Sequence, residues 1–276
     1  KKTNPDYAGI DSVLKWMLVT CFGYTGYKNA KFGRVDVHEA ITRISREALI
    51  SSKELAEAMG FEVLHGITDC LFVQGDPVDR LKTAIEAESG YLMEVETFDW
   101  VVFLPQKDGT GAYTWYYGRL DDGEVKVRGI MARRGDCPPY VQRFQQDALA
   151  VMGRTRSIAE LHEVAPEVGE IYRRYCDGLA TAPVEDLVIS RRISTVNYTR
   201  RCPERGAVAS YRQAGVPVAP GMTIRYVVRD ARAGLADCAW EADHADRFYY
   251  RRVLAKAWGE VTAGFGQSAG GCCRVN

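Results

Sequence analysis

Four short β-prone runs in the middle of the chain limit its fold more than any other feature. They cover residues 91–97, 100–105, 112–120 and 124–130, and Gly-containing turn stretches end at Gly111 and Gly123 between the later runs. Consecutive strands that are joined by tight turns pair in antiparallel fashion. The sequence therefore predicts an antiparallel sheet in this region.

Helical patterns surround the predicted sheet. Before it, apolar residues recur at helical spacing, and two β-prone runs broken at Gly66–Asp69 predict a tight hairpin. After it, helical segments outnumber strands, and Pro166 is expected to interrupt one of them. The expected helices are 11–22, 37–59, 77–87, 138–152, 157–178, 203–214 and 246–262, and the expected later strands lie near 187–190 and 222–229.

The composition is that of a globular protein. Of the 276 residues, 46% are apolar, which is enough to offset chain entropy and argues against disorder. No run of about 18 apolar residues occurs, so no membrane span is expected. The chain begins Lys-Lys-Thr-Asn-Pro without an initiator Met, which indicates a fragment, a trimmed chain or a processed product.

The charges are balanced overall but unevenly distributed. Residues 1–127 hold 14 Lys and Arg against 20 Asp and Glu, whereas residues 128–229 hold 16 Arg, no Lys and 10 acids. Arginine provides a fork of donors that suits phosphate oxygens. The basic block is therefore either a nucleic-acid contact surface or a solvated, salt-bridged helical surface.

The eight cysteines do not form a recognisable site. No Cys-x-x-Cys pair occurs and only four histidines could join them, which argues against structural zinc. A disulfide framework is not expected in a chain of this length without a secretory signal, so a reducing cytoplasm is the expected location.

Two segments in the first half are candidates for chemistry. Lys15 and Phe22 are seven residues apart and share one helix face, where a lysine can hold a triphosphate while Gly23 lets a base pair approach the backbone. The alternative is a lysine whose stem lies along an amphipathic helix. Asp69, at the hairpin tip, either bonds nearby backbone amides or joins a second carboxylate in holding Mg²⁺.

Further along the chain, residues 125–136 and 217–228 place arginines beside predicted strands or loops. There they can face the backbone of a nucleic-acid duplex.

Taken in order, these segments resemble the carboxyl-terminal half of family B DNA polymerases, most closely the archaeal members. The family's Lys-x-x-x-Asn-Ser-x-Tyr-Gly finger motif stands here as Lys15-x-x-x-Val-Thr-x-Phe-Gly23. Its Tyr-Gly-Asp-Thr-Asp-Ser palm hairpin stands as His65-Gly-Ile-Thr-Asp-Cys70. Residues 125–136 resemble the palm-to-thumb stretch and residues 212–226 a thumb consensus, and the likeness covers about residues 5–265.

The resemblance implies an α+β fold, with an antiparallel-sheet palm, packed helices and a mostly helical thumb. Residues 1–27 would be a finger-helix remnant, 28–134 the palm and 135–276 the thumb. The edge between the lobes is expected near 131–137, where the charge changes sign.

It also implies a role for each matching residue. Lys15 would contact the triphosphate of an incoming deoxynucleoside triphosphate, and Phe22 and Gly23 would pack under the nascent base pair. Asp69 would be a catalytic residue and a ligand to Mg²⁺. The primer–template duplex would be held by Tyr116, Tyr117, Arg128, Arg133, Arg134, Arg212 and Arg225.

Several family residues are replaced or have no match. Nothing matches the family's first metal-binding carboxylate, Ile67 replaces the first hairpin aspartate, Val19 replaces the finger asparagine, and residues 112–117 lack the lysines of the primer-contact segment. One carboxylate cannot hold two metals, so this chain alone is not expected to polymerise.

Two main interpretations remain open. The chain is either a polymerase portion that works when a missing amino-terminal portion supplies the other carboxylate, or an inactive paralogue that serves as a DNA-binding or assembly subunit. A third is an α+β protein with a chance likeness.

Overall fold

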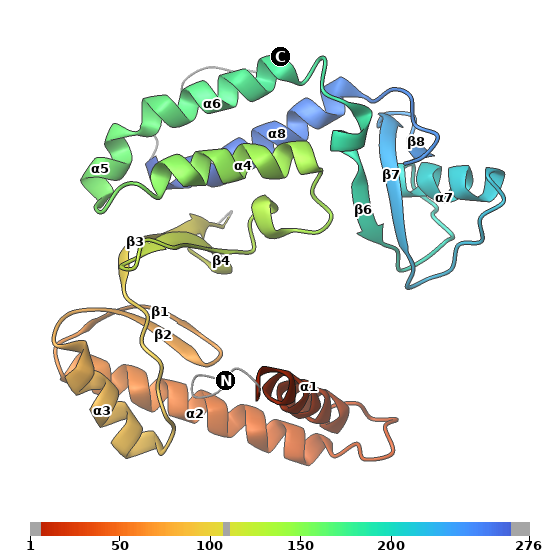
Figure 1. The fold of residues 1–276 in the computed structure, drawn as a ribbon. Helices are drawn as coiled ribbons and strands as arrows, with labels where there is room; N and C mark the ends of the chain where they lie inside the picture. Colours follow the sequence, from red (N-terminus) through yellow and green to blue (C-terminus); the bar gives the residue numbers. More distant parts are fainter. Residues whose placement is uncertain (1–6, 107–110, 266–276) are drawn as a thin grey trace. The chain divides into compact units, whose positions relative to one another are not determined.

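The computed structural model describes residues 7–106 and 111–265, and it divides into two compact units, Lys1–Val95 and Glu96–Asn276 (Figure 1). The charge switch at 131–137 lies within the second unit rather than between the two. The assignments of 1–27, 28–134 and 135–276 to finger, palm and thumb stay predictions. Cys272, Cys273 and most of the predicted 108–111 turn lie outside the described residues.

The first unit combines three helices with one hairpin. Helix α2 ends where Gly60 takes a φ of 89°, and the amide of Gly90 caps α3 by donating to the Glu86 carbonyl. Its small core is formed by Ala56, Phe61, Leu81 and Ile85. The elements are α1 (Ala8–Thr25), α2 (Val35–Ala58), β1 (Glu62–Ile67), β2 (Cys70–Gln74) and α3 (Val78–Ser89).

Helix α1 differs from the other helices of this unit. None of its described side chains is buried, and Trp16 and Leu18 are 72% and 73% exposed. Even so, among the helices that the structure describes, none combines the length and apolarity needed to cross a membrane.

The second unit begins with the predicted antiparallel sheet, in the order β3-β4-β5. Three of the four expected runs form strands, β3 (Phe98–Pro105), β4 (Gly111–Leu120) and β5 (Val125–Arg128). The prediction of a strand over 91–97 is wrong. A strand needs a partner to satisfy its backbone, and this run forms the connection into the second unit, with Leu92 92% exposed.

Three long helices, α4, α6 and α8, lie beside one another (Figure 1). Their apolar faces and the sheet share one core, which includes Trp100, Tyr117, Phe144 and Leu254. Pro166 interrupts the helical pattern as predicted, since it lies in the first turn of α6. The elements are η2 (Met131–Arg133), α4 (Pro139–Met152), α5 (Ile158–Glu163), α6 (Ala165–Gly178) and α8 (Arg247–Thr262).

A second three-stranded sheet has a core of its own. Strands β6 (Ile189–Arg192), β7 (Thr223–Asp230) and β8 (Leu235–Cys238) pair antiparallel in that order, and η3 (Val184–Leu187) precedes them. Helix α7 (Pro203–Gln213) packs so closely on β8 that a Cβ on Gly206 would lie 2.5 Å from the Gly234 carbonyl oxygen. The sequence did not predict β8, because it is short and follows a loop. The α+β fold class is confirmed.

Candidate nucleic-acid interface

The hairpin that carries Asp69 turns in two residues, Thr68 and Asp69, between the paired positions Ile67 and Cys70. Thr68 has a φ of 51°, a left-handed conformation that a β-branched residue rarely adopts. Asp69 is exposed, and its amide donates to the Ile67 carbonyl. The turn therefore presents one carboxylate to solvent at the tip of the hairpin.

A two-metal phosphoryl-transfer site needs several oxygen ligands around each ion. Within residues 7–106 and 111–265, no group of three His, Cys, Asp or Glu side chains could hold a metal ion. Ile67, two residues before Asp69, has no ligating atom in its side chain. The described residues do not by themselves fit the Mg²⁺ site that the resemblance implies.

The three predicted nucleotide-binding residues lie on α1. Lys15 and Phe22 are both exposed, and the Phe22 ring stacks on His38 of α2 with 4.3 Å between ring centroids. The His38 imidazole also lies 3.2 Å from the Phe22 carbonyl oxygen. A Cβ built on Gly23 would meet nothing within 4 Å, so the space beside Gly23 on the surface of α1 is open. Their roles toward a nucleotide stay predictions.

The arginines of β5 and η2 divide into two kinds. Arg128 and Arg133 are exposed, and among the described residues neither guanidinium forms an ion pair. Arg134 instead holds Asp136 with two hydrogen bonds of 3.0 Å, Nε to Oδ1 and Nη2 to Oδ2. The hydrogen bond from Arg134 lowers the pKa of Asp136. Arg134 is therefore largely neutralised, while Arg128 and Arg133 keep their charge available.

Buried polar side chains fix the backbone between these arginines. The Met131 amide donates to Glu260 of α8 over 2.9 Å, and the Ala132 amide donates to Gln145 of α4. Gln145 also donates to Glu260 over 2.8 Å. Because the Gln145 and Glu260 side chains are buried, this network holds the η2 turn rigidly and fixes the position of the Arg133 backbone.

Arg212 and Arg225 lie on α7 and β7. Both are exposed, and neither is in an ion pair with any described residue. The Tyr211 hydroxyl lies 2.9 Å from the Arg225 amide nitrogen and donates to the Arg225 carbonyl over 3.2 Å, which ties α7 to this strand.

The two tyrosines predicted to contact DNA are both buried. Tyr117 is fully buried, and its hydroxyl donates to the Val261 carbonyl over 2.6 Å. Burial raises the pKa of this phenol. Tyr116 is also buried. In this structure neither ring offers a surface to a duplex, so we leave both out of the proposed DNA contacts.

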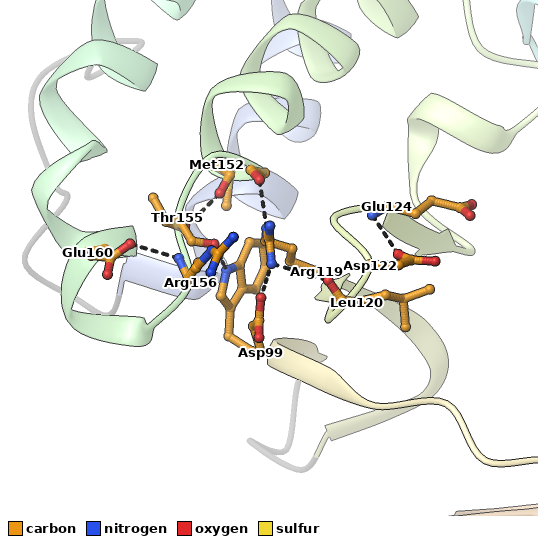
Figure 2. Close-up of polar contacts among 11 residues, drawn as sticks. Asp99, Arg119, Leu120, Asp122, Glu124, Met152, Thr155, Arg156 and Glu160 are labelled. Atoms are coloured by element: carbon orange, nitrogen blue, oxygen red, sulfur yellow. Dashed lines mark hydrogen bonds and ion pairs between the residues drawn. The ribbon is translucent and has the colours of Figure 1, made fainter.

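Arg119, two residues after Tyr117 on β4, also has a structural role. Its guanidinium pairs with Asp99 and donates to the carbonyls of Gly153 and Leu120, over 2.9 and 3.2 Å (Figure 2). Nearby, the Trp100 indole donates to the Thr155 carbonyl over 2.9 Å. These bonds attach the first sheet to the end of α4, so the Arg119 charge is not available to a ligand.

A concentration of arginines around α7 was not predicted from the sequence. Between residues 191 and 212 there are six arginines and one acid, Glu204, which pairs with Arg191 over 2.8 Å. The signal was present as a local charge run, but it lay between the motif segments. Of these six, only Arg212 was predicted as a contact.

Comparison with known proteins identifies the same family as the motifs. The chain is 32% identical over 162 residues to DNA polymerase 2 of Saccharolobus solfataricus. This match covers 59% of the chain and 25% of the relative. It is 29% identical over 232 residues to DNA polymerase 2 of Aeropyrum pernix, covering 82% of this chain and 28% of the relative. The solved family B DNA polymerase of Pyrobaculum calidifontis matches 96% of this chain with a TM-score of 0.60 and 24% identity. The chain is a relative of the archaeal family B DNA polymerases.

This polymerase relative spans only about a quarter of the curated proteins named above, and 35% of the solved chain. No protein-family model matches its sequence. The resemblance predicted from the motifs is confirmed, and the activity of the longer relatives comes to this chain only as a proposal.

Proposed function

We propose that this polymerase relative is the palm and thumb portion of a family B DNA polymerase and binds primer–template DNA. The main support is that Arg128, Arg133, Arg212 and Arg225 are exposed and form no ion pair with any described residue. Elsewhere in the second unit many guanidiniums are paired with carboxylates, as in Arg154–Glu167 and Arg174–Asp147. Exposed, unpaired arginines are the groups that neutralise phosphates.

The test is the salt dependence of binding. A fluorescently labelled primer–template duplex is titrated with the protein at several salt concentrations, and binding is followed by anisotropy. Arg128→Gln and Arg133→Gln should each weaken binding and reduce the log–log salt slope by about 0.9 for each phosphate that is no longer neutralised. Arg154→Gln, which removes an arginine already paired with Glu167, is the matched control.

Binding that does not change with salt would contradict the proposal. So would an equal weakening in Arg154→Gln, because general surface charge would then explain the effect.

For catalysis we propose that Asp69 provides one ligand to Mg²⁺ and that a second carboxylate comes from a portion of the polymerase outside the described residues. Lys15 would then contact the triphosphate of the incoming nucleotide, above Phe22 and Gly23. The exposed position of Asp69 at the hairpin tip supports this role. By itself, the chain is expected not to extend a primer.

The second candidate is a catalytically inactive paralogue that binds DNA or assembles with a polymerase. It is favoured by Ile67, which lies beside the tip where the family has an aspartate. Primer extension by the complete protein separates the two candidates. Incorporation that is abolished in Asp69→Ala supports the enzyme, and no incorporation at any Mg²⁺ concentration supports the paralogue.

A further inference from the structure

A surface pocket of about 350 Å³ lies between the loop after β6 and helix α7. The loop contributes a mainly polar wall, and α7 contributes the other wall. The lining residues that matter here are Asn197, Tyr198, Thr199, Arg205, Val208 and Arg212.

Two arginines stand at the ends of the helical wall. Arg205 and Arg212 are seven residues apart, which places them on one helix face about 10.5 Å apart along the axis. Among the described residues neither guanidinium has a carboxylate partner. Val208 and Ala209 line the pocket between them, so the helical wall is apolar in its middle and cationic at both ends.

The loop opposite adds neutral donors and acceptors. Asn197 and Thr199 are exposed, and Tyr198 is half-buried. Just beyond the pocket, Arg200 and Arg201 are exposed as well. The single acid of this stretch, Glu204, is already paired with Arg191. The pocket and its rim are therefore strongly positive.

We propose that this pocket binds one unpaired nucleotide of a DNA strand. Its phosphate lies against Arg205 or Arg212, which can each bond two phosphate oxygens. Its sugar and base lie over the apolar middle of the α7 wall.

Pocket size and the surrounding charge favour a nucleotide within a strand. A volume of 350 Å³ is in the range of small-molecule sites and far exceeds what a lone phosphate fills. A base inside the pocket cannot be paired at the same time, which selects single-stranded DNA. The further arginines outside the pocket fit the neighbouring phosphates of a continuing strand. This inference rests on the proposed DNA binding and adds a form of DNA to it.

The experiment uses a substitution in the middle of the helical wall. Ala209 is exposed on α7, and Ala209→Glu puts a carboxylate four residues from Arg205 and three from Arg212, where it pairs with them. Ala209→Gln has nearly the same size without the charge and is the matched control. Binding of a labelled twelve-nucleotide oligo-dT and of a blunt duplex is measured by anisotropy, with circular dichroism to check folding.

Ala209→Glu is expected to weaken oligo-dT binding about tenfold. It should weaken duplex binding much less, because only Arg212 of the four proposed duplex arginines is affected, and Ala209→Gln should stay near wild type with both DNAs. Arg205→Gln and Arg212→Gln should each lower the log–log salt slope for oligo-dT by about 0.7.

Three outcomes would overturn the inference. One is unchanged oligo-dT binding in folded Ala209→Glu while the wild type still binds duplex, which leaves the proposed function intact. Another is displacement of the oligonucleotide by millimolar dTMP as effectively as by unlabelled oligo-dT, which marks a mononucleotide site. If the wild type binds neither DNA, the proposed function fails as well.

Discussion

Thr68 shows how a single residue can depart from local preference beside a candidate site. Two-residue hairpin turns favour glycine or asparagine where φ is positive, yet this turn has a threonine at a φ of 51° next to Asp69. Such strain costs of the order of 1–3 kcal/mol and persists only where the surroundings impose it.

Arg133 and Arg134 were both predicted to contact DNA, yet they differ in their pairing. Arg134 is paired with Asp136, whereas Arg133 forms no ion pair with a described residue.

Thr68→Gly is expected to raise the free energy of unfolding of the first unit by up to about 1 kcal/mol. Strain is relieved, although glycine returns part of the gain through its larger unfolded-state entropy. Urea unfolding followed by circular dichroism measures the change. Thr68→Ala keeps the Cβ and should give no gain, so equal stabilisation by both variants would contradict the strain argument.

The thiols should differ sharply in reactivity. Burial raises the pKa of Cys137 to about 12, so almost no thiolate is present near neutral pH. Cys21 is exposed on α1. Brief alkylation of the native protein with iodoacetamide at pH 8, read by peptide mass spectrometry, should modify Cys21 and leave Cys137 intact. Equal labelling would mean that the core around Cys137 is open in solution.

At the scale of elements, the turn η2 depends on groups that are distant in sequence. The Met131 amide is satisfied by Glu260, 129 residues away, and the Ala132 amide by Gln145. A short 3₁₀ turn has little stability of its own. The position of the β5–η2 arginines is therefore a consequence of how α4 and α8 pack.

Glu260→Ala should destabilise the protein by about 1–3 kcal/mol, because it leaves the buried Met131 amide without an acceptor. Chemical denaturation provides the measurement. Glu260→Gln keeps an acceptor oxygen and should cost less than Glu260→Ala. If the two variants are destabilised by the same amount, the charge of Glu260 matters rather than its hydrogen bond.

The pair Arg134–Asp136 gives this region a pH dependence. Because the folded-state pKa of Asp136 is lowered, its contribution is fully present above the unfolded value of about 3.9 and is lost as pH falls through the folded value. Wild type should exceed Asp136→Asn in stability at pH 7 by less than about 1 kcal/mol, since the pair is partly solvent-screened. Denaturation at pH 7 and pH 3 should show that difference shrinking, and a constant difference would contradict the assignment.

For the whole molecule, the two units differ in how much core they contain. The first has four buried apolar side chains and leaves α1 without any described buried one, whereas the second has two larger cores. Local stability follows the extent of such packing. The Asp69 carboxylate at the hairpin tip lies in the first unit, and the exposed arginines that form no ion pair with a described residue lie in the second.

Native hydrogen exchange should expose this difference. Backbone amides of α1 are expected to exchange at least about a hundredfold faster than those of α4 and α8, because none of the described side chains of α1 is buried. Mass spectrometry of peptic fragments resolves the three helices. Comparable protection of α1 would mean that another surface covers its apolar side chains in solution.

The sequence by itself determined the order of helices and strands, the α+β class and the family, since each follows from local periodicity, turn residues and short motifs. It also placed the arginines in one block. It missed β8 and overextended the first sheet to residues 91–97, because short strands are specified by their partners.

Only the tertiary structure decided which side chains are available for function. Tyr117 bonds a carbonyl 144 residues away, and Arg119 closes on Asp99 and the end of α4. Arg128 and Arg133, which look no different in the sequence, remain exposed. Burial and pairing depend on contacts between residues far apart along the chain, and a local sequence pattern does not encode such contacts.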